Sequence, residues 1–424
     1  MGIRAMGSRL RHLHARMGGN LKHDVGDDML FYGFARRHRA PVPGARGITR
    51  ARKGGLCMKK QVPSGGLRPD ASTLTHTGCR ADGIFLLLPI LVPGAILLLG
   101  LAPSAHAAGM EVEPLKVIFD TDMDGDNDDV AAAAILHALA DSGTADILAM
   151  GVVSRCSYSP ACLDAINTYY GRGDIPIGVY KGTALAEMGS PYAKAVAERC
   201  PHDLGLSSEV PDVVGVYRRV LSGQLDGTVT MIVVGQMNNL VDLLASPPDR
   251  YSDLAGRDLV RRKVATLFVM APYFNERNEY QRAYNFVSSP KAARELIAQW
   301  PTKIKFGEGN LGHQHFIGSR LSETPAGNPS RIAFEAYFAG QTQNKRHCAD
   351  PTTVLYAVCG TQYFGEVGPG ACDVREDGYT RWDAAGDKQH FYNTQKLPVE
   401  ELEQVLEQLL IKPPKLQRPQ THSR

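Results

Sequence analysis

Short apolar segments alternate with amphipathic segments along the chain from about residue 115 onward. Runs rich in β-branched residues, such as Val117–Phe119 and Val229–Val234, indicate buried strands, and the segments between such runs carry helical periodicity. The expected strands are 115–119, 146–153, 175–180, 229–234, 263–270 and 303–306. The expected helices are 128–141, 160–171, most of 190–223, 239–245, 290–299 and 398–411. This alternation predicts a single α/β domain, 108–424, with a mainly parallel open sheet flanked by helices.

The first part of the chain lacks this alternation. Residues 1–83 read as a basic leader of low order, because residues 1–60 hold 14 Lys and Arg against 3 Asp and show no sustained apolar period. Met58, followed by two lysines, is the more usual start of an exported chain. Residues 1–57 are therefore candidates for a segment that a wrongly assigned start codon adds to the chain.

Residues 84–107 match a secretory signal peptide. The stretch 84–101 is almost wholly apolar, and Ala105-His106-Ala107 supplies the small residues of a cleavage site. Pro89 and Pro93 break its helical continuity, which argues against a stable membrane span, although an uncleaved anchor remains an alternative. We expect the mature protein to be periplasmic or secreted and to meet the membrane only through this segment.

Removal of the leader changes the charge of the protein. The whole chain has a formal charge of +3, of which residues 1–60 contribute +11, while the charges of 61–107 cancel. The part from Ala108 onward therefore carries about −8, and it shows no basic patch with interleaved aromatic residues. Nucleic acid is excluded as an expected partner.

Six cysteines remain after the leader. An even number in an exported protein favours disulfides, with fifteen connectivities open and a local Cys156–Cys162 loop among them. The absence of a Cys-x-x-Cys motif argues against zinc and against thioredoxin-type redox chemistry. The six are Cys156, Cys162, Cys200, Cys348, Cys359 and Cys372.

Six carboxylates crowd into ten residues directly after the first expected strand. They are Asp120, Asp122, Asp124, Asp126, Asp128 and Asp129. A helix dipole tolerates the last two in its first turn, but six close carboxylates repel one another at neutral pH. A hard cation bound by oxygen, Ca²⁺ or Mg²⁺, is the simplest remedy. The loop also follows the carboxyl end of a strand, where open α/β sheets bind their ligands.

Three other interpretations explain this loop less well. An EF-hand-like loop starting at Asp120 would need a Glu at its twelfth position, where Ala131 stands, and a helix rather than a strand before it. A phosphatase of the haloacid dehalogenase type would use Asp120 and Asp122 but leaves the Asp128–Asp129 pair unexplained. A solvated acidic loop without a role agrees poorly with the buried strand that precedes it.

The segment from Asp120 to Asp129, followed by a helix of small residues, resembles the N-terminal signature of the nucleoside hydrolase family. Three later segments extend the resemblance over about 115–411: the strand and turn at Ile232–Leu240, Ala283-Tyr-Asn285 with Ser289-Pro, and Asp350-Pro. The resemblance implies a nucleoside hydrolase-like fold with Ca²⁺ as cofactor. The implied calcium ligands are Asp122, Asp129, Asp350 and the carbonyl of Val234.

The same resemblance assigns further roles. Asp122 would also be the catalytic base, and Asp128 and Asn285 would contact ribose hydroxyls. Asp120 would not touch the metal itself but would support the residues that bind it. The chain departs from the family at Ala283, where relatives carry a Glu, and at Ala349, where many carry a His that serves the leaving base.

Three other histidines could approach the pocket: His313, His315 and His347. Since Ala349 cannot protonate a leaving base, we expect catalysis to depend strongly on the quality of the leaving group unless one of these histidines supplies the proton.

The sequence therefore predicts calcium-dependent hydrolysis of the N-glycosidic bond of ribonucleosides or related N-ribosides, with a small-molecule nucleoside as partner and a homo-oligomer left open. Two alternatives stay open: a non-catalytic calcium-dependent riboside-binding protein, suggested by the lost Glu and His, and an exported metal-dependent phosphatase with Asp120 as nucleophile.

Overall fold

The computed structural model describes residues 113–185, 189–270, 272–339 and 344–415. The expected leader, 1–83, and the expected signal peptide, 84–107, lie outside the described residues. Within the described ranges, no helix combines the length and the apolar character that a membrane crossing requires.

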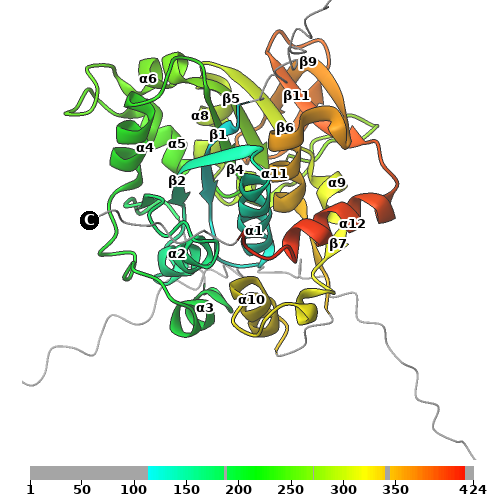
Figure 1. Ribbon diagram of the computed structural model, residues 1–424. Helices are drawn as coiled ribbons and strands as arrows, with labels where there is room; N and C mark the ends of the chain where they lie inside the picture. The colour runs from blue at the N-terminus through cyan, green and yellow to red at the C-terminus, as the bar shows by residue number, and fades with distance from the viewer. Residues whose placement is uncertain (1–112, 186–188, 271, 340–343, 416–424) are drawn as a thin grey trace, which may run out of the picture. The chain divides into compact units, whose positions relative to one another are not determined.

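A nine-stranded sheet forms the centre of the domain (Figure 1). Across the sheet the strands lie in the order β10 (Thr380–Asp383), β9 (Phe364–Val374), β11 (His390–Gln395), β6 (Lys303–Gly307), β5 (Val264–Met270), β4 (Val229–Val233), β1 (Leu115–Thr121), β2 (Ala145–Val152) and β3 (Ile177–Val179). All neighbours from β11 to β3 are parallel, whereas β9 pairs antiparallel with both β10 and β11. The predicted mainly parallel α/β sheet is confirmed.

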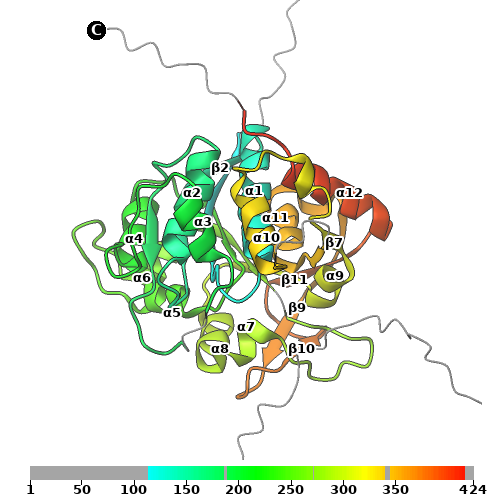
Figure 2. The ribbon, with the colours of Figure 1, turned by 90° about the horizontal axis from the view of Figure 1, so that it is seen from below.

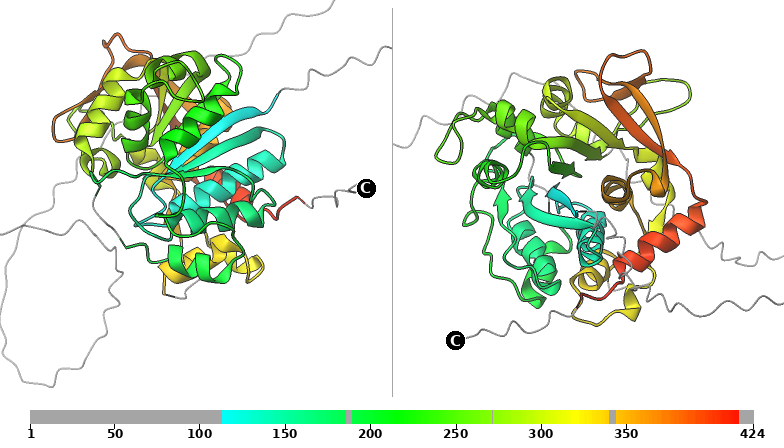
Figure 3. Two further views of the ribbon diagram at one scale, coloured as in Figure 1. Left: turned by 90° about the vertical axis from the view of Figure 1, so that its left-hand side faces the viewer. Right: turned by 45° about the horizontal axis from the view of Figure 1, so that its top comes forward.

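Helices cover both faces of this sheet. One face packs against α1 (Asp128–Asp141), α2 (Ser159–Tyr169) and α11 (Ala349–Cys359), and these helices are covered in turn by α3 (Ala193–Arg199), α10 (Pro329–Tyr337) and α12 (Val399–Leu410). The other packs against α4 (Val213–Ser222), α5 (Asn238–Ala245), α6 (Gly256–Lys263) and α8 (Pro290–Gln299). In the left view of Figure 3 the cyan strands lie between the green helices and the teal helices. Figure 2 shows α3 and α10 side by side.

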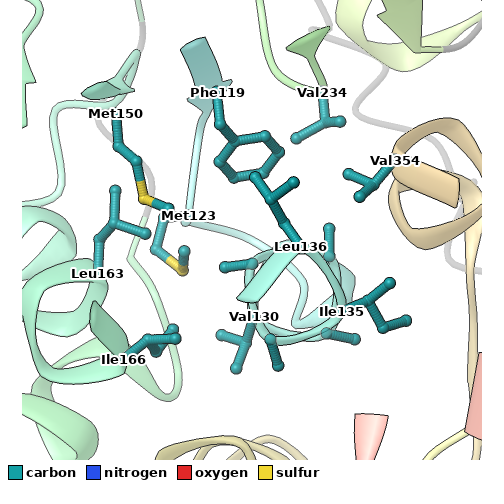
Figure 4. Packing of buried hydrophobic residues seen from close by; sticks show 14 of the residues in the cluster. Phe119, Met123, Val130, Ile135, Leu136, Met150, Leu163, Ile166, Val234 and Val354 are labelled. Carbon is teal, nitrogen blue, oxygen red and sulfur yellow. The ribbon is translucent and has the colours of Figure 1, made fainter. Parts of the chain in front are cut away.

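Strand β1 contributes to both layers because successive side chains point to opposite faces. Val117 and Phe119 belong to the core beneath α1, and Ile118 belongs to the core on the other face. Figure 4 shows the ring of Phe119 close to Leu136 of α1 and Val234 beyond β4. The consecutive alanines 131–134 of α1 are fully buried, and their small side chains let this helix pack closely on β2 and against α11 beside it.

Several expected elements differ from the structure. The stretch expected to be mostly helical, 190–223, holds only α3 and α4, and residues 200–212 between them are not helical. Strands β9 to β11 had no counterpart among the expected strands, because β9 is half exposed and lacks a continuous apolar run. The six cysteines are all free thiols, so the expected disulfides are not formed in this structure.

The structure also contains several short elements. They are α7 (Tyr284–Val287), α9 (Gly309–Gln314), and the two-stranded sheet of β7 (Phe316–Ile317) and β8 (Arg346–His347). Because β7 pairs with β8, segments that are thirty residues apart in sequence meet just before α11.

Candidate active site

The acidic loop lies where β1 ends and α1 begins. Residues 122–127 connect the two elements, β4 ends beside β1, and α11 lies beside α1 in the same helix layer. The position is the carboxyl edge of the parallel strands, as the sequence predicts.

Asp129, in the first turn of α1, points back at the loop. Its Oδ1 accepts hydrogen bonds from the hydroxyl of Thr121 and from the backbone nitrogen of Met123, the latter at 3.1 Å. Burial raises the pKa of Asp129 well above its usual value, and the charges of Asp122, Asp126 and Asp128 raise it further. The site therefore holds negative charge that the protein alone does not compensate.

Asp122 is held by a residue that follows β4. The Nε2 of Gln236 donates to its Oδ2 at 3.0 Å. Burial, together with the charges of nearby aspartates, raises the pKa of Asp122 to about 6. Gly235 allows this approach, because a Cβ at that position would lie only 2.7 Å from the backbone nitrogen of Asp122.

Asp350 comes from the start of α11, more than 200 residues further along the chain. Its backbone nitrogen lies 3.5 Å from Oδ2 of Asp128, and its own side chain is buried with Oδ1 unpartnered. Burial and then the charges of Asp128 and Asp129 raise the pKa of Asp350 well above its usual value. The structure thus brings Asp122, Asp128, Asp129 and Asp350 into one electrostatic cluster.

The donor chemistry of this cluster fits a hard cation. Buried carboxylate oxygens without a partner, Oδ1 of Asp350 and Oδ1 of Asp124, are the groups that Ca²⁺ binds. Among the described residues, however, no group of three or more His, Cys, Asp or Glu side chains is already arranged as a metal site. A cation would have to draw these carboxylates together.

Val234 and Asn285 contact each other directly. The amide nitrogen of Asn285, in α7, donates to the carbonyl of Val234 at 2.6 Å. The family resemblance assigned Asn285 to the sugar and the carbonyl of Val234 to the metal. The hydrogen bond occupies one lone pair of the carbonyl and leaves the second lone pair for another partner.

Two basic side chains, Arg346 and His347, lie on one side of Asp128. Arg346 forms an ion pair with Asp126, and its Nε lies 3.9 Å from Oδ1 of Asp128. The Nδ1 of His347 lies 3.5 Å from Oδ2 of Asp128. Burial alone would raise the pKa of Asp128, but His347 and Arg346 outweigh it and hold this pKa well below its usual range.

Two of the three candidate histidines reach the site. The rings of His313 and His347 stack with centroids 4.1 Å apart, and the hydroxyl of Tyr273 lies 3.1 Å from Nδ1 of His313. His315, in contrast, is fully buried and bonds Gln395 through Nε2 at 3.0 Å. His315 therefore has a structural role.

Asp120 lies below the cluster, fully buried. Its Oδ2 accepts hydrogen bonds from the hydroxyl of Tyr217 at 2.5 Å and from the amide of Asn239 at 2.8 Å. Burial raises the pKa of Asp120 to about 7. A carboxylate enclosed in this way cannot reach a phosphoryl group as a nucleophile, which argues against the phosphatase alternative. Its place agrees with a role behind the ligands.

Sequence reasoning missed several groups that shape the site. Gln236 and Asn239 stand in a segment that the family resemblance had marked, so their position after β4 was a usable signal. Arg346, Tyr217 and Ser154, whose hydroxyl donates to Asp124 at 2.6 Å, carry no local motif. Their contacts depend on how distant segments pack.

Comparisons with known proteins agree on the fold. No family model and no curated protein matches the chain. Among solved structures, an inosine-uridine preferring nucleoside hydrolase from Bacillus anthracis aligns with a TM-score of 0.52 at 12% identity, covering 70% of this chain and 98% of that one. The inosine-guanosine nucleoside hydrolase gives 0.53 at 15% identity, with the same coverage of 70% and 98%.

A third similar structure is the type III effector protein XopQ complexed with adenosine diphosphate ribose. Its TM-score is 0.51 at 18% identity, and the match covers 70% of this chain and 92% of that one. The chain therefore has the nucleoside hydrolase fold that its sequence signature predicts.

Proposed function

We propose that this chain is a calcium-dependent hydrolase of the N-glycosidic bond of ribonucleosides or related N-ribosides. The carrying observation is the meeting of Asp122 and Asp129 with Asp350, from elements far apart in sequence, at the carboxyl edge of the sheet. The names of the similar structures support the same reaction class, since they include nucleoside hydrolases and an effector complexed with an ADP-linked ribose.

Asp122, Asp129, Asp350 and the carbonyl of Val234 would hold the calcium ion. When bound, the ion supplies the positive charge that lets these crowded carboxylates remain ionised together and that attracts hydroxyl oxygens. The support from the structure is the excess of buried carboxylate at this point and the free oxygen of Asp350.

Asp122 would take the proton from the attacking water. Its carboxylate is buried beside the other proposed calcium ligands, and in its ionised form it can accept that proton. Gln236 fixes one of its oxygens, which orients the other. Cleavage of an N-riboside builds positive charge on the sugar, as in other glycoside hydrolysis. The ionised Asp128, beside the cluster, would stabilise that positive charge and bind a ribose hydroxyl.

The leaving base would receive its proton from the His313–His347 pair. Ala349 cannot donate, but these stacked rings lie next to Asp128, and Tyr273 contacts His313. Asn285, in α7, would complete the contacts to the sugar, in keeping with its buried position beside Val234. We also propose that the protein acts in the periplasm or outside the cell, on the strength of the signal-like segment 84–107.

The proposal is tested with the protein in calcium buffer and a panel of nucleosides, nucleotides and phosphate esters. Appearance of free base and ribose in equal amounts supports it. Phosphate release without ribose would establish a phosphatase instead. Saturable calcium-dependent binding of nucleosides without turnover would establish a non-catalytic riboside-binding protein instead. The presence of Ala283 where relatives carry a Glu is the feature that suggests this alternative.

A further inference from the structure

A cavity lies on the same edge of the sheet as the aspartate cluster. Its volume is about 480 Å³, within the range of small-molecule sites. Strands β11, β6, β5, β4 and β1 are neighbours in this order and all run parallel, so their carboxyl ends share one edge. The aspartates follow β1, and the cavity lies where β6 and β11 end. The cavity therefore continues the edge that carries the proposed catalytic site.

Two pairs of neighbouring residues join the cavity to the stacked histidines. The hydroxyl of Tyr273 lies 3.1 Å from Nδ1 of His313, and the next residue, Phe274, lines the cavity. His313 stacks on His347, and the residue after it, Gln314, also lines the cavity. The histidine pair is the proposed proton donor to the leaving base. A group attached to that base and reaching past the pair would therefore enter the cavity.

The charge of the lining disfavours an anionic group. None of the described residues that line the cavity is Lys, Arg or His, and Glu276 and Glu308 are its acidic side chains. The oxygens of Glu308 accept hydrogen bonds from the backbone nitrogens of Phe274 and Leu311 at 3.0 and 2.8 Å. Glu276, in contrast, is exposed. A phosphate placed here would meet like charge and no cation.

The remaining lining combines polar groups with angled aromatic rings. Asn278 and Gln314 present exposed amides, which can donate and accept hydrogen bonds as hydroxyl groups require. Phe274 and Trp382 meet at an interplanar angle of 61°, and Trp382 and Tyr392 at 72°. The rings thus form an angled wall rather than one flat surface. Such a lining suits a puckered, uncharged group that carries several hydroxyls.

We propose that the leaving base of the natural substrate carries an uncharged, hydroxyl-rich substituent, such as a glycosyl group, and that this cavity binds the substituent. The inference rests on the proposed hydrolase function, because it takes the His313–His347 pair as the place of the leaving base. It extends that function by naming the substrate as an N-riboside larger than a simple nucleoside.

The test compares substrates that differ only in one group on the base. Uridine and inosine are each prepared with a glucosyloxymethyl group, a methyl group or a phosphooxymethyl group on the base. In saturating calcium, kcat/KM of at least one glucosylated nucleoside should exceed that of its methyl counterpart about tenfold or more, and the phosphorylated nucleosides should gain nothing. Ala384→Leu narrows the cavity from an exposed lining position and should bring this ratio close to one. Ala385→Leu, at the neighbouring exposed position outside the lining, should keep it.

The outcomes separate this inference from the hydrolase assignment. Turnover of the methyl nucleosides without a gain from either glucosyl group, a gain from the phosphate, or an unchanged ratio in Ala384→Leu would overturn the inference and leave the hydrolase assignment intact. If no nucleoside is turned over, the hydrolase assignment fails, and calorimetry with the same ligands decides the inference. Tenfold tighter binding of a glucosylated nucleoside than of its methyl counterpart would then support it, and equal binding would overturn it.

Discussion

The imidazole rings of His313 and His347 stack 4.1 Å apart, although one belongs to α9 and the other to β8. The pair lies against Asp128, with Nδ1 of His347 3.5 Å from its carboxylate. The chain thus has Ala349 where many relatives carry a histidine, but His313 and His347 place two imidazole rings beside the site.

The stacked pair yields the first prediction. Replacing His313 or His347 with Ala should lower turnover of inosine by about 10²–10⁴-fold, because a positioned general acid is lost. Hydrolysis of p-nitrophenyl riboside, whose leaving group needs no proton, should change little. The matched control is His202→Ala, since His202 bonds only nearby backbone carbonyls. Equal losses on both substrates would refute the role of the pair in leaving-group protonation.

Asp129→Asn should abolish tight calcium binding. The aspartate is one of three carboxylates drawn from two distant elements, and its neighbours already repel one another. Added calcium should raise the melting temperature of the unaltered protein and leave that of the variant unchanged, because a ligand stabilises only the state that it binds. Calorimetry gives the affinity directly. The control is Asp146→Asn, at an exposed position near the start of β2, which should bind calcium like the unaltered protein. An unchanged calcium affinity in Asp129→Asn would show that Asp129 is not a metal ligand.

Gly235 is expected to be necessary for the position of Asp122. An added Cβ would lie 2.7 Å from both the backbone nitrogen of Asp122 and a methyl carbon of Val153, so the loop would have to shift. Gly235→Ala should reduce kcat/KM by roughly 10²-fold, the scale associated with a misplacement of about 1 Å. Gly215→Ala is the control, because open space surrounds Gly215 in α4. Full activity in Gly235→Ala would show that the approach of β4 to the loop does not position Asp122.

Acid should destabilise the fold through His137. This side chain is fully buried in α1, bonds Asn167 at 2.8 Å and stacks on Tyr170 at 4.8 Å. Burial lowers its pKa from 6.5 to about 4, so between these values the unfolded chain binds a proton that the folded chain does not. Stability is therefore lost as pH falls from 6.5 toward 4, by on the order of 3 kcal/mol.

The variant His137→Gln removes this titration. Urea unfolding at several pH values between 7 and 4.5 should show a shallower loss of unfolding free energy in the variant than in the unaltered protein. Identical slopes would mean that His137 does not control the acid sensitivity.

The local parts of the site were predictable from sequence. The run from Asp120 to Asp129 encodes strand, loop and helix start within ten residues, so its chemistry and its place at the strand end follow from neighbouring residues alone. The run of small residues after it, 131–134, indicates a closely packed helix without knowledge of what it packs against. Asp350 was identified because Asp350-Pro, leading into an apolar helix, resembles a segment of the nucleoside hydrolase family.

The rest depended on packing between distant segments. No local signal indicates that Arg346 will pair with Asp126, 220 residues earlier. The sequence also does not distinguish His313 from His315, although in the structure His313 stacks on His347 and His315 bonds Gln395. Strand β9 was not predicted because its middle residues are exposed. Residues 200–212 were expected to be helical but form turns and irregular backbone. Tertiary contacts override local preference in such places.

The most direct test of the account is the release of reducing sugar from inosine and uridine by purified protein in calcium, measured beside Asp122→Asn. We predict ribose release by the unaltered protein that EDTA abolishes and excess calcium restores, and a loss of about 10²–10⁴-fold in kcat for Asp122→Asn. Ribose release that persists undiminished in EDTA or in Asp122→Asn, or no release from any riboside in saturating calcium, would contradict it.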